Sequence, residues 1–347
     1  MELEIFKNKG LSGLANLGNT CFINSCVQVL SHTYELSLLL NQPSLKKKIK
    51  NKFESALLVE YDNLRTLMWN ENCVVSPGRF VKTIQKIAEI KDIELFTGFK
   101  QNDVPEFLMF VIDCFHTALS REVTMKIYGT TENDTDNIAT KCFEMIKNMY
   151  SKEYSEIWNL FYAVHVSELL ALDTGERVCL TPEPFFMINL PIPTNNKNVT
   201  LLDCFQLYVA GEILSGDNAW FYDKIDNVID VRKKISFWSL PTILVIDFKR
   251  FNARNQKNHT LITFPLNNLD LSPFVIGYKK TSYVYDLYAV CNHGGGAGGG
   301  HYSSYVKNAN GNWYHFNDTL VTEIDPASVV SAKAYCLFYR IIKKNDV

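Results

Sequence analysis

The sequence lacks a hydrophobic run long enough to cross a membrane, and it lacks an excess of charge of either sign. Its strongest apolar run, TILVIDF at residues 242–248, has the length of a strand, whereas a spanning helix needs about 20 residues. The first residues, MELEIFKNKG, contain no apolar signal-peptide core. The 35 Lys and Arg residues nearly balance the 37 Asp and Glu residues, which disfavours a broad basic face for nucleic acid. We therefore expect no membrane or nucleic-acid partner, and a location in the cytosol or nucleus.

Paired cysteines are also missing. None of the nine cysteines forms a CxxC pair, and no other clustered spacing of zinc ligands is present. In a reducing compartment a disulfide framework is not expected, so most of these thiols should be small buried apolar groups. The sequence therefore predicts no bound metal and no cofactor.

The sequence does contain enough apolar material for a packed core, since 47% of its residues are hydrophobic and 21% are charged. A length of 347 residues suggests about two domains, or one large domain with lobes. Helical periodicity precedes runs rich in β-branched and aromatic residues, which predicts an α+β fold with a helical first half and a largely antiparallel second half. The expected helices are residues 21–40, 53–69 and 104–119, and the expected strands are residues 185–190, 242–248, 282–290, 301–306, 313–317 and 335–342.

Two segments show neither pattern. Residues 129–155 begin with a polar stretch, and we expect a loop or an insertion there. The glycine run GGGAGGG at residues 294–300 predicts a flexible hairpin tip in which no strand survives. A phosphate-binding loop is disfavoured, because no Lys-Ser/Thr follows the run and it leads into an expected strand.

Cys21 is a candidate nucleophile. It follows a turn and opens a helix with Thr20 as the expected N-cap, and free N–H groups there favour a thiolate and offer donors to an oxyanion. The alternative is a buried structural cysteine, which describes most cysteines.

A nucleophilic cysteine needs a base and a group that orients the base. His301 begins an expected strand directly after the glycine run, and Asn317 and Asp318 end the next strand of the same expected hairpin. In an extended chain Asn317 and Asp318 point to opposite faces, so only one of them can touch His301.

Together these segments resemble the ubiquitin-specific proteases, the papain-like cysteine deubiquitinases of peptidase family C19. Residues 13–25, GLANLGNTCFINS, are similar to the cysteine box of that family. Its histidine box is matched by YDLYAV at residues 285–290, His293, GHY at residues 300–302, Trp313 and FND at residues 316–318. Further matches are QNDVPEFL at residues 101–108, LPIP at 190–193, GDN at 216–218 and FKRF at 248–251. The resemblance extends from about residue 11 to about residue 341.

The resemblance implies a papain-like peptidase with thumb, palm and fingers. The catalytic domain would span residues 11–342, with the thumb at about 11–155 and the fingers and palm at about 156–342. Residues 1–10 would be a lead and residues 343–347 a tail. The implied activity is a deubiquitinating thiol protease that hydrolyses the peptide or isopeptide bond after the C-terminal glycine of ubiquitin, through a covalent cysteine acyl-enzyme. Its partners would be ubiquitin and ubiquitinated proteins, and we expect a monomer.

Catalytic roles follow from the same resemblance. Cys21 would be the nucleophile, His301 the general base and Asn317 the residue that orients His301. Several family members carry Asp in place of Asn317, and a neutral amide stabilises imidazolium less than a carboxylate does. Asp318 would supply the missing charge or hold a water.

The resemblance also implies binding roles. Asn16 would join the Cys21 N–H in the oxyanion hole. Asp103 and Glu106 would grip the basic, extended tail of ubiquitin. A helix N-cap is the alternative for Asp103, and the two roles are compatible.

The chain departs from the family at the zinc site of the fingers. The positions of the two CxxC pairs are occupied by Ala171 and Thr174 and by Tyr222 and Ile225, so we expect no structural zinc. Packing would hold the fingers instead, with Trp220, Phe221 and Tyr222 as the candidate core.

Several alternatives stay open. The glycine run is either a gate beside the ubiquitin tail or a tether without that role. The lysine-rich stretch at residues 46–52 is either a solvated surface or a contact for an acidic partner. The chain could also be a ubiquitin-binding scaffold without turnover, or act on a ubiquitin-like modifier.

Overall fold

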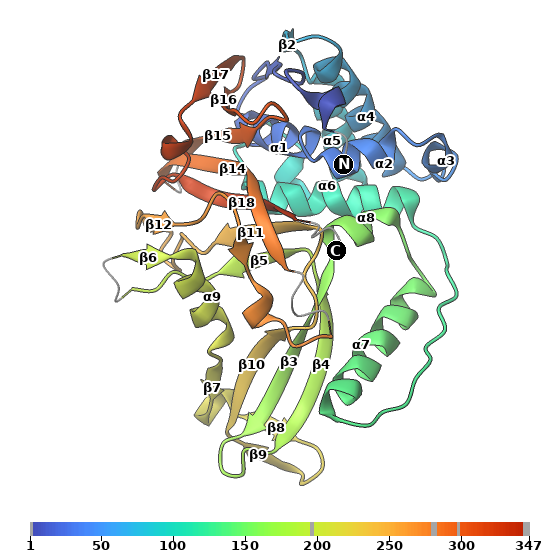
Figure 1. Ribbon diagram of the computed structural model, residues 1–347, viewed down its shortest axis with the longest axis vertical. Helices are drawn as coiled ribbons and strands as arrows, with labels where there is room; N and C mark the ends of the chain where they lie inside the picture. Colours follow the sequence, from blue (N-terminus) through green and yellow to red (C-terminus); the bar gives the residue numbers. More distant parts are fainter. Residues whose placement is uncertain (1–2, 195–197, 279–282, 297–298, 343–347) are drawn as a thin grey trace.

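The computed structural model describes residues 3–194, 198–278, 283–296 and 299–342. A helical lobe at the top of Figure 1 is formed mainly by residues 3–119. Its helices are α1 (Cys21–Ser31), α2 (Tyr34–Leu40), α3 (Pro43–Lys46), α4 (Ser55–Asn70), α5 (Gly78–Ile90) and α6 (Val104–Leu119), and its short parallel strands are β1 (Gly13–Leu14) and β2 (Val74–Val75). The tail expected at residues 343–347 lies outside the described residues.

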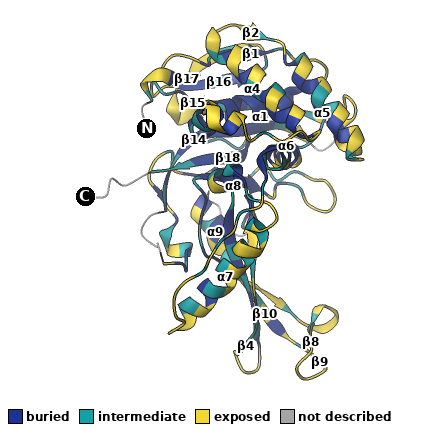
Figure 2. Ribbon diagram, turned by 90° about the vertical axis from the view of Figure 1, so that its right-hand side faces the viewer, coloured by how far each residue is buried: buried dark blue, intermediate teal, exposed yellow. Residues whose placement is uncertain are grey.

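Helix α1 is buried along its whole length, because α6 packs on one side of it and the strand β15 on another. The expected helix at residues 21–40 is interrupted, since His32 ends α1 and Thr33 precedes α2. The expected helix at residues 104–119 is confirmed with the same bounds, with Pro105 in its first turn, where the missing N–H costs little. These helices give the lobe one apolar core, which also includes side chains from the strands of the second half of the chain. Figure 2 shows the buried parts of the lobe in dark blue.

A central sheet of eight strands carries the second half of the fold. Its strands are, in order, β17 (Leu320–Ile324), β16 (Trp313–Asn317), β15 (Gly299–Lys307), β14 (Val284–Gly296), β18 (Ala334–Ile341), β11 (Ile243–Phe248) and β5 (Met187–Leu190), with β13 (Leu269–Asp270) paired to β14. The pairs are antiparallel except for β11 and β5, which run parallel. The expected α+β architecture is therefore confirmed.

The prediction for the glycine run was wrong in part. Strand β14 continues through Gly296 and β15 begins at Gly299, while residues 297 and 298 lie outside the described residues. The two strands approach so closely that a Cβ atom on Gly295 would lie 2.6 Å from the Gly299 carbonyl oxygen. Glycine at these positions permits the close pairing of β14 and β15. The glycine run, which we expected to be flexible, therefore forms part of the paired strands.

A second sheet extends away from the helical lobe toward the bottom of Figure 1. We call it the distal sheet; its order is β4 (Arg177–Phe185), β3 (Ala163–Ala171), β10 (Val231–Phe237) and β7 (Glu212–Leu214). The hairpin of β8 (Trp220–Tyr222) and β9 (Asn227–Ile229) lies at its tip, and α8 (Glu156–Phe161) leads into β3. Helix α9 (Leu201–Val209) packs against β5 of the central sheet and β10 of the distal sheet, and it also contacts β6 (Val199–Thr200), which pairs in parallel with β12 (Ile262–Thr263) beside the central sheet.

The segment expected as a loop or insertion at residues 129–155 contains the helix α7 (Asp134–Tyr150), so that prediction was wrong. Its polar start is a capping box: Asn133 accepts from the backbone N–H of Asp136, whose carboxylate accepts from the N–H of Asn133. Ile138, Ala139 and Cys142 are its buried residues and pack against the distal sheet. This narrow apolar face explains why the helical pattern is weak in the sequence.

The expected aromatic core of the fingers is also wrong. The Phe221 side chain is 49% exposed, and Trp220 and Tyr222 are only partly buried. Trp220 and Tyr222 contact each other on one face of the hairpin, with ring centroids 5.3 Å apart. The β8–β9 pair forms a separate two-stranded sheet, and an isolated hairpin offers little covered surface.

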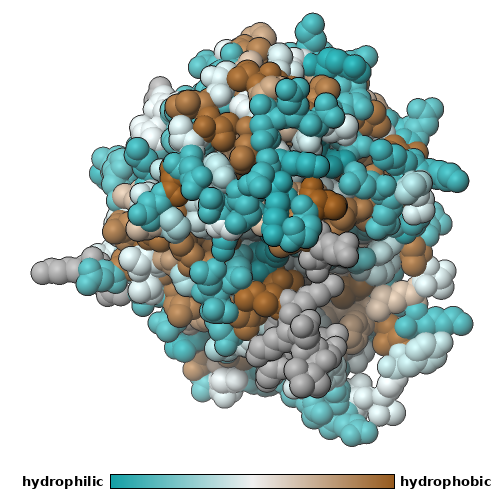
Figure 3. All heavy atoms as spheres, turned by 45° about the horizontal axis from the view of Figure 1, so that its top comes forward, coloured by the Kyte–Doolittle hydropathy of each residue, from teal (hydrophilic) through white to brown (hydrophobic). Residues whose placement is uncertain are grey.

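All nine cysteines are free thiols. Cys73 is exposed and Cys179 half-buried, and the others are buried as expected. Within the described ranges, no helix is long and apolar enough to span a bilayer. On the face shown in Figure 3, hydrophobic side chains are interspersed with hydrophilic ones.

The lysine-rich stretch makes several contacts within the chain. Lys46 pairs with Asp62 at 3.1 Å, Lys48 pairs with Glu156 at 2.8 Å, and Lys52 donates to the Ser120 hydroxyl at 3.4 Å. This stretch therefore ties α3 to α4 and α8, and part of its charge is already neutralised.

Candidate active site

Cys21 lies where the sequence predicts it, at the first residue of α1, with 4% of its surface exposed. The preceding turn uses left-handed backbone at Gly18 and Asn19, with φ values of 105° and 53°. Thr20 occupies the N-cap position without a capping bond to the helix, and its hydroxyl accepts from the Leu17 N–H at 2.9 Å. The turn therefore stabilises itself and leaves the first N–H groups of the helix unused by the cap.

The environment of the Cys21 sulfur contains opposing influences. Burial raises the pKa of the Cys21 thiol, and the negative charge of Asp318 raises it further. Backbone N–H groups of Tyr302, Phe22 and Cys21 itself act in the opposite direction. The net result is a raised pKa, so this thiol needs a neighbouring base to become a thiolate at neutral pH.

Helix α1, which begins at Cys21, packs against β15, the strand that carries His301. His301 is exposed, and its Nε2 lies 2.5 Å from the Asn317 side-chain oxygen at the end of β16. An amide oxygen only accepts, so Nε2 carries the proton and Nδ1 is the nitrogen that can receive one. Strands β15 and β16 are neighbours, which brings these two side chains together as the expected hairpin requires.

Asn317 and Asp318 serve different sides of the site. Asp318 turns away through a left-handed backbone conformation with a φ of 52°, and its carboxylate accepts from Asn16 at 3.0 Å and from Asn24 at 2.8 Å. Asn317 is thus the one of the pair that contacts the His301 ring.

The segment before Cys21 also makes close backbone contact with residues 318 and 319, which follow β16. The Leu14 N–H donates to the Asp318 carbonyl at 2.8 Å, and a Cβ atom on Gly13 would lie 2.3 Å from the Thr319 carbonyl oxygen. Glycine at position 13 is therefore required for the segment before Cys21 to approach the end of β16.

Asn16 is exposed and held in a fixed orientation. Its Oδ1 accepts from the N–H groups of Gly18 at 3.1 Å and Thr20 at 3.2 Å, while its Nδ2 donates to Asp318. An amide nitrogen carries two hydrogens, so one donor of Asn16 remains for a ligand. Asn24, one turn after Cys21, was not predicted as a site residue. Its place in the cysteine box was visible, but its pairing with Asp318 depends on the fold.

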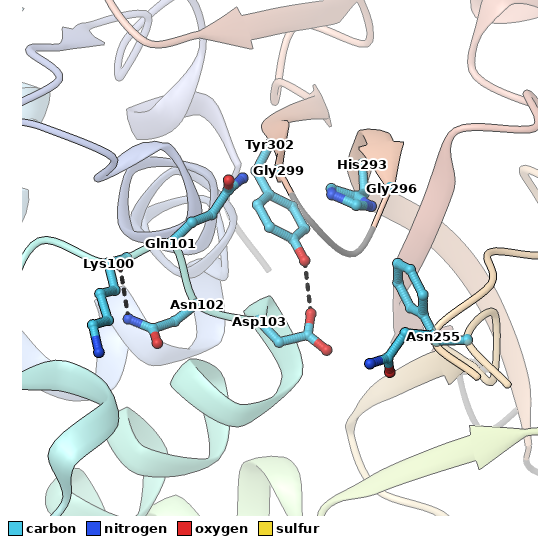
Figure 4. Close-up of a pocket in the computed structure, with 10 residues that line it drawn as sticks. Lys100, Gln101, Asn102, Asp103, Asn255, His293, Gly296, Gly299 and Tyr302 are labelled. Atoms are coloured by element: carbon cyan, nitrogen blue, oxygen red, sulfur yellow. Dashed lines mark hydrogen bonds between the residues drawn. The ribbon is translucent and has the colours of Figure 1, made fainter. Parts of the chain in front are cut away.

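A cavity of about 520 Å³ lies between the helical lobe and the central sheet. Figure 4 shows its lining, which comes from both sides: Lys100, Gln101, Asn102, Asp103, Phe251, Asn255, His293, Gly296, Gly299 and Tyr302. The cavity adjoins the strand that carries His301, since Gly299 and Tyr302 of β15 line it.

Asp103 is the N-terminal neighbour of α6, but its side chain makes no capping bond. Its two carboxylate oxygens accept from the hydroxyls of Tyr302 at 2.7 Å and Tyr335 at 2.9 Å (Figure 4 shows the first). Burial and the Asp103 charge both raise the pKa of each tyrosine, so their protons stay in place. The structure thus brings Asp103 to the cavity wall, and sequence analysis had not identified its two tyrosine partners.

Glu106 lies elsewhere. It is exposed and lines a separate hollow of about 760 Å³ with Met109, Tyr162 and Phe186 among its neighbours. Burial, followed by the Asp103 charge, raises the pKa of the Glu106 carboxyl. The two acidic residues are thus coupled electrostatically but face different hollows.

A lysine–histidine pair also borders the cavity of Asp103. The Lys257 Nζ donates to the backbone carbonyl of His293 at 2.7 Å and lies 2.9 Å from the ring Nδ1 of the same histidine. Burial and then the charge of Arg250 lower the pKa of Lys257 to about 8, whereas burial and then Lys257 lower the pKa of His293 to about 4. His293 is therefore neutral at physiological pH, and its ring stacks on Tyr302 with centroids 4.6 Å apart.

No cluster of three His, Cys, Asp or Glu side chains suited to a metal occurs in the part of the chain that the structure describes. Ala171 and Thr174 lie at the turn between β3 and β4, and Tyr222 and Ile225 lie at the turn between β8 and β9. Both turns are at the tip of the distal sheet (Figure 1).

Comparison with known proteins agrees with this architecture. The family profile described as ubiquitin carboxyl-terminal hydrolase matches residues 12–339. The chain is 36% identical to human ubiquitin carboxyl-terminal hydrolase 2 over 346 residues, covering 96% of this chain and 55% of that protein. It is 35% identical to the protein of the same name from Gallus gallus, covering 97% of this chain and 95% of that protein. The chain thus spans about half the length of the human relative.

Solved structures show the same fold. The SAGA Ubp8/Sgf11/Sus1/Sgf73 DUB module bound to ubiquitin aldehyde contains a chain that matches with a TM-score of 0.73 and 21% identity, covering 99% of this chain and 72% of that chain. The same module bound to monoubiquitin matches with a TM-score of 0.73 and 22% identity, covering 97% and 70%. The papain-like fold expected from the sequence is therefore confirmed, and the chain belongs to the ubiquitin carboxyl-terminal hydrolase family.

Proposed function

We propose that this chain is a deubiquitinating thiol protease that cleaves the peptide or isopeptide bond after the C-terminal glycine of ubiquitin. The observation that carries the proposal is the placement of Cys21 at the start of α1, a helix that packs against β15, the strand on which His301 is hydrogen-bonded to Asn317. Membership of the family supports this assignment, as does the binding of ubiquitin aldehyde by the solved module of the same fold.

In the first step, His301 Nδ1 takes the proton of the Cys21 thiol, and the thiolate attacks the carbonyl carbon of the terminal glycine. Asn317 holds Nε2, so the ring presents Nδ1 for this transfer. Proton transfer by a positioned base contributes about 10²–10⁴-fold to such reactions.

The attack creates an oxyanion, which we assign to the Cys21 N–H and the second hydrogen of the Asn16 amide. Asp318 holds Asn16 in this orientation and is therefore a positioning residue. His301 then returns its proton to the leaving amine and leaves a thioester between Cys21 and ubiquitin. Water attacks the thioester with His301 as base, which releases ubiquitin and regenerates the thiol.

The cavity beside β15 is the proposed channel for the tail of ubiquitin. Its walls come from the helical lobe and the central sheet, and Gly296 and Gly299 lie on one side, where a narrow extended chain can approach the backbone. The Asp103 carboxylate offers negative charge to a basic tail even while it accepts from two tyrosines. Glu106 adds negative charge from the separate hollow that it lines.

A ubiquitin probe with an electrophilic C-terminus tests the proposal. We expect covalent labelling of the wild-type chain, loss of labelling in Cys21→Ala, and hydrolysis of a ubiquitin C-terminal amide by the wild type only. Folded protein that binds ubiquitin without labelling would identify a scaffold and overturn the proposal. Parallel probes built on ubiquitin-like modifiers determine whether ubiquitin itself is the substrate.

A further inference from the structure

One side chain bridges the helical lobe and the central sheet at the residue directly before His301. The Gln101 amide oxygen accepts from the Gly300 N–H at 3.1 Å, and its amide nitrogen donates to the Gly300 carbonyl. A single side chain thus satisfies both backbone groups of Gly300. Figure 4 shows Gln101 reaching toward β15 beside Gly299 and Tyr302.

This part of β15 has a partner strand on one side only. On that side β14 pairs with it, Gly294 lying opposite His301 and Gly295 opposite Gly300. On the other side the ladder with β16 begins at Ser304, so residues 299–303 extend past it. His301 is therefore carried on an overhanging strand edge, whose free N–H and C=O groups would otherwise need other partners.

The Gln101 amide replaces the missing strand at one position. A primary amide presents one donor and one acceptor side by side, which matches the N–H and C=O of one extended residue. A second bond follows the same spacing: Asp103, two residues after Gln101, accepts from Tyr302, two residues after Gly300. Residues 101 and 103 thus hold the neighbours of His301 on both sides.

We propose that Gln101 is a positioning residue for catalysis, which fixes the backbone of Gly300 and thereby keeps the His301 ring in reach of Cys21. This inference rests on the proposed function, because it concerns the base of that reaction. In this role Gln101 is hydrogen-bonded to the Gly300 backbone and does not contact the reacting atoms.

Two substitutions separate the parts of this interaction. Gln101→Met keeps nearly the same volume and removes both hydrogen bonds. Gln101→Glu keeps the acceptor for the Gly300 N–H, and its carboxylate cannot donate to the carbonyl. The matched control is Gln85→Met, because Gln85 also donates to a glycine carbonyl, that of Gly98, but does so within the helical lobe.

The first measurement separates turnover from binding with a ubiquitin C-terminal fluorogenic amide. We expect Gln101→Met to lower kcat roughly tenfold or more, because small displacements of a catalytic group are costly. We expect the Kd for ubiquitin, measured in a Cys21→Ala background, to change less than about twofold, since the lost interaction acts on the reaction and not on binding. Gln101→Glu should fall between the wild type and Gln101→Met, and Gln85→Met should match the wild type.

The second measurement needs no ubiquitin. The rate at which iodoacetamide alkylates Cys21 is followed as a function of pH, with Cys21→Ala as the blank for the other thiols. An aligned imidazolium favours the thiolate, so the Gln101→Met profile should move to higher pH while the Gln85→Met profile does not move. A purely structural loss would lower the melting temperature without moving this profile.

Three results would overturn the inference: an unchanged kcat in Gln101→Met, a loss confined to ubiquitin affinity, or an unmoved alkylation profile. If the wild type itself hydrolyses no ubiquitin substrate, the proposed function fails. The alkylation profile then still decides whether Gln101 aligns His301 with Cys21. Should Gln101→Met fail to fold, the profile of Gln101→Glu decides in its place.

Discussion

The carboxylate of Asp318 accepts a hydrogen bond from the Asn16 amide at 3.0 Å, while its neighbour Asn317 contacts the His301 ring. Two adjacent residues at the end of β16 therefore hold two different groups of the proposed active site. Asn317 orients the base, and Asp318 orients the amide assigned to the oxyanion. This division follows from the left-handed backbone at Asp318, which sends its side chain toward the segment before Cys21.

The first prediction concerns the charge of Asp318. Its negative charge raises the pKa of the Cys21 thiol, so Asp318→Asn should lower that pKa and move the pH profile of iodoacetamide alkylation to lower pH. The same variant should turn over a ubiquitin amide roughly tenfold more slowly, because one amide oxygen replaces two carboxylate oxygens as acceptors for Asn16 and Asn24. Asp318→Asn should therefore combine alkylation of Cys21 at lower pH with slower turnover of the ubiquitin amide.

Asp173→Asn is the matched control, since Asp173 lies at the turn of the distal sheet and accepts from the Thr174 N–H. It should leave both the alkylation profile and turnover unchanged. An alkylation profile for Asp318→Asn that stays in place or moves to higher pH would contradict the electrostatic role assigned to Asp318.

The sequence predicted much of the candidate site and missed the contacts that assemble it. Cys21, His301 and Asn317 stand in recognisable segments, and the helix and strand patterns around them are strong. Gln101, Asn24 and Tyr335 gain their partners only when distant segments meet, and no local pattern reports a bond between residues 101 and 300. Helix α7 was missed for another reason: its polar first turn hides a capping box, and few of its residues are buried.

The second prediction is that the purified chain contains no stoichiometric zinc. The four ligand positions of the family are taken by Ala171, Thr174, Tyr222 and Ile225, whose side chains cannot form a tetrahedral thiolate site. We expect less zinc than protein by elemental analysis, and no shift in the melting temperature after chelation with EDTA. One zinc per chain, or destabilisation by the chelator, would show that other residues bind the metal.

The third prediction is a loss of stability in weak acid that depends on His32. His32 is fully buried among aromatic rings, and burial lowers its pKa from 6.5 to about 4. The unfolded state therefore binds a proton more readily than the folded state between these values. The stability that neutral His32 contributes is complete above about pH 6.5 and is lost as the pH falls toward 4.

The melting temperature should therefore fall between pH 7 and pH 5, and it should fall less in His32→Phe, which cannot titrate. His259→Phe is a control for general histidine effects, because His259 is exposed in a loop. Equal acid sensitivity in the wild type and His32→Phe would assign the loss to other groups. His293 is one candidate, because its pKa is lowered in the same direction.

The fourth prediction separates two roles of Asp103. Asp103→Asn removes the negative charge, but its amide oxygen still accepts from one of the tyrosine hydroxyls, Tyr302 or Tyr335. If the carboxylate attracts the basic tail of ubiquitin, KM should rise several-fold with a smaller change in kcat, because binding is lost before the chemical step. The effect should weaken at high ionic strength, since salt screens an interaction between partly solvated charges.

The alternative is that Asp103 acts through its hydrogen bond with Tyr302 on β15. If Asp103 acts mainly by holding Tyr302 beside His301, Asp103→Asn should lower kcat with little change in KM, as expected for Gln101→Met. Tyr302→Phe resolves the two cases, because it removes the Tyr302 hydroxyl from Asp103 and keeps the negative charge. Tail recognition by charge predicts that Tyr302→Phe binds substrate at least as tightly as the wild type with little change in kcat, since the carboxylate then has one fewer internal partner, whereas a positioning role predicts a lower kcat.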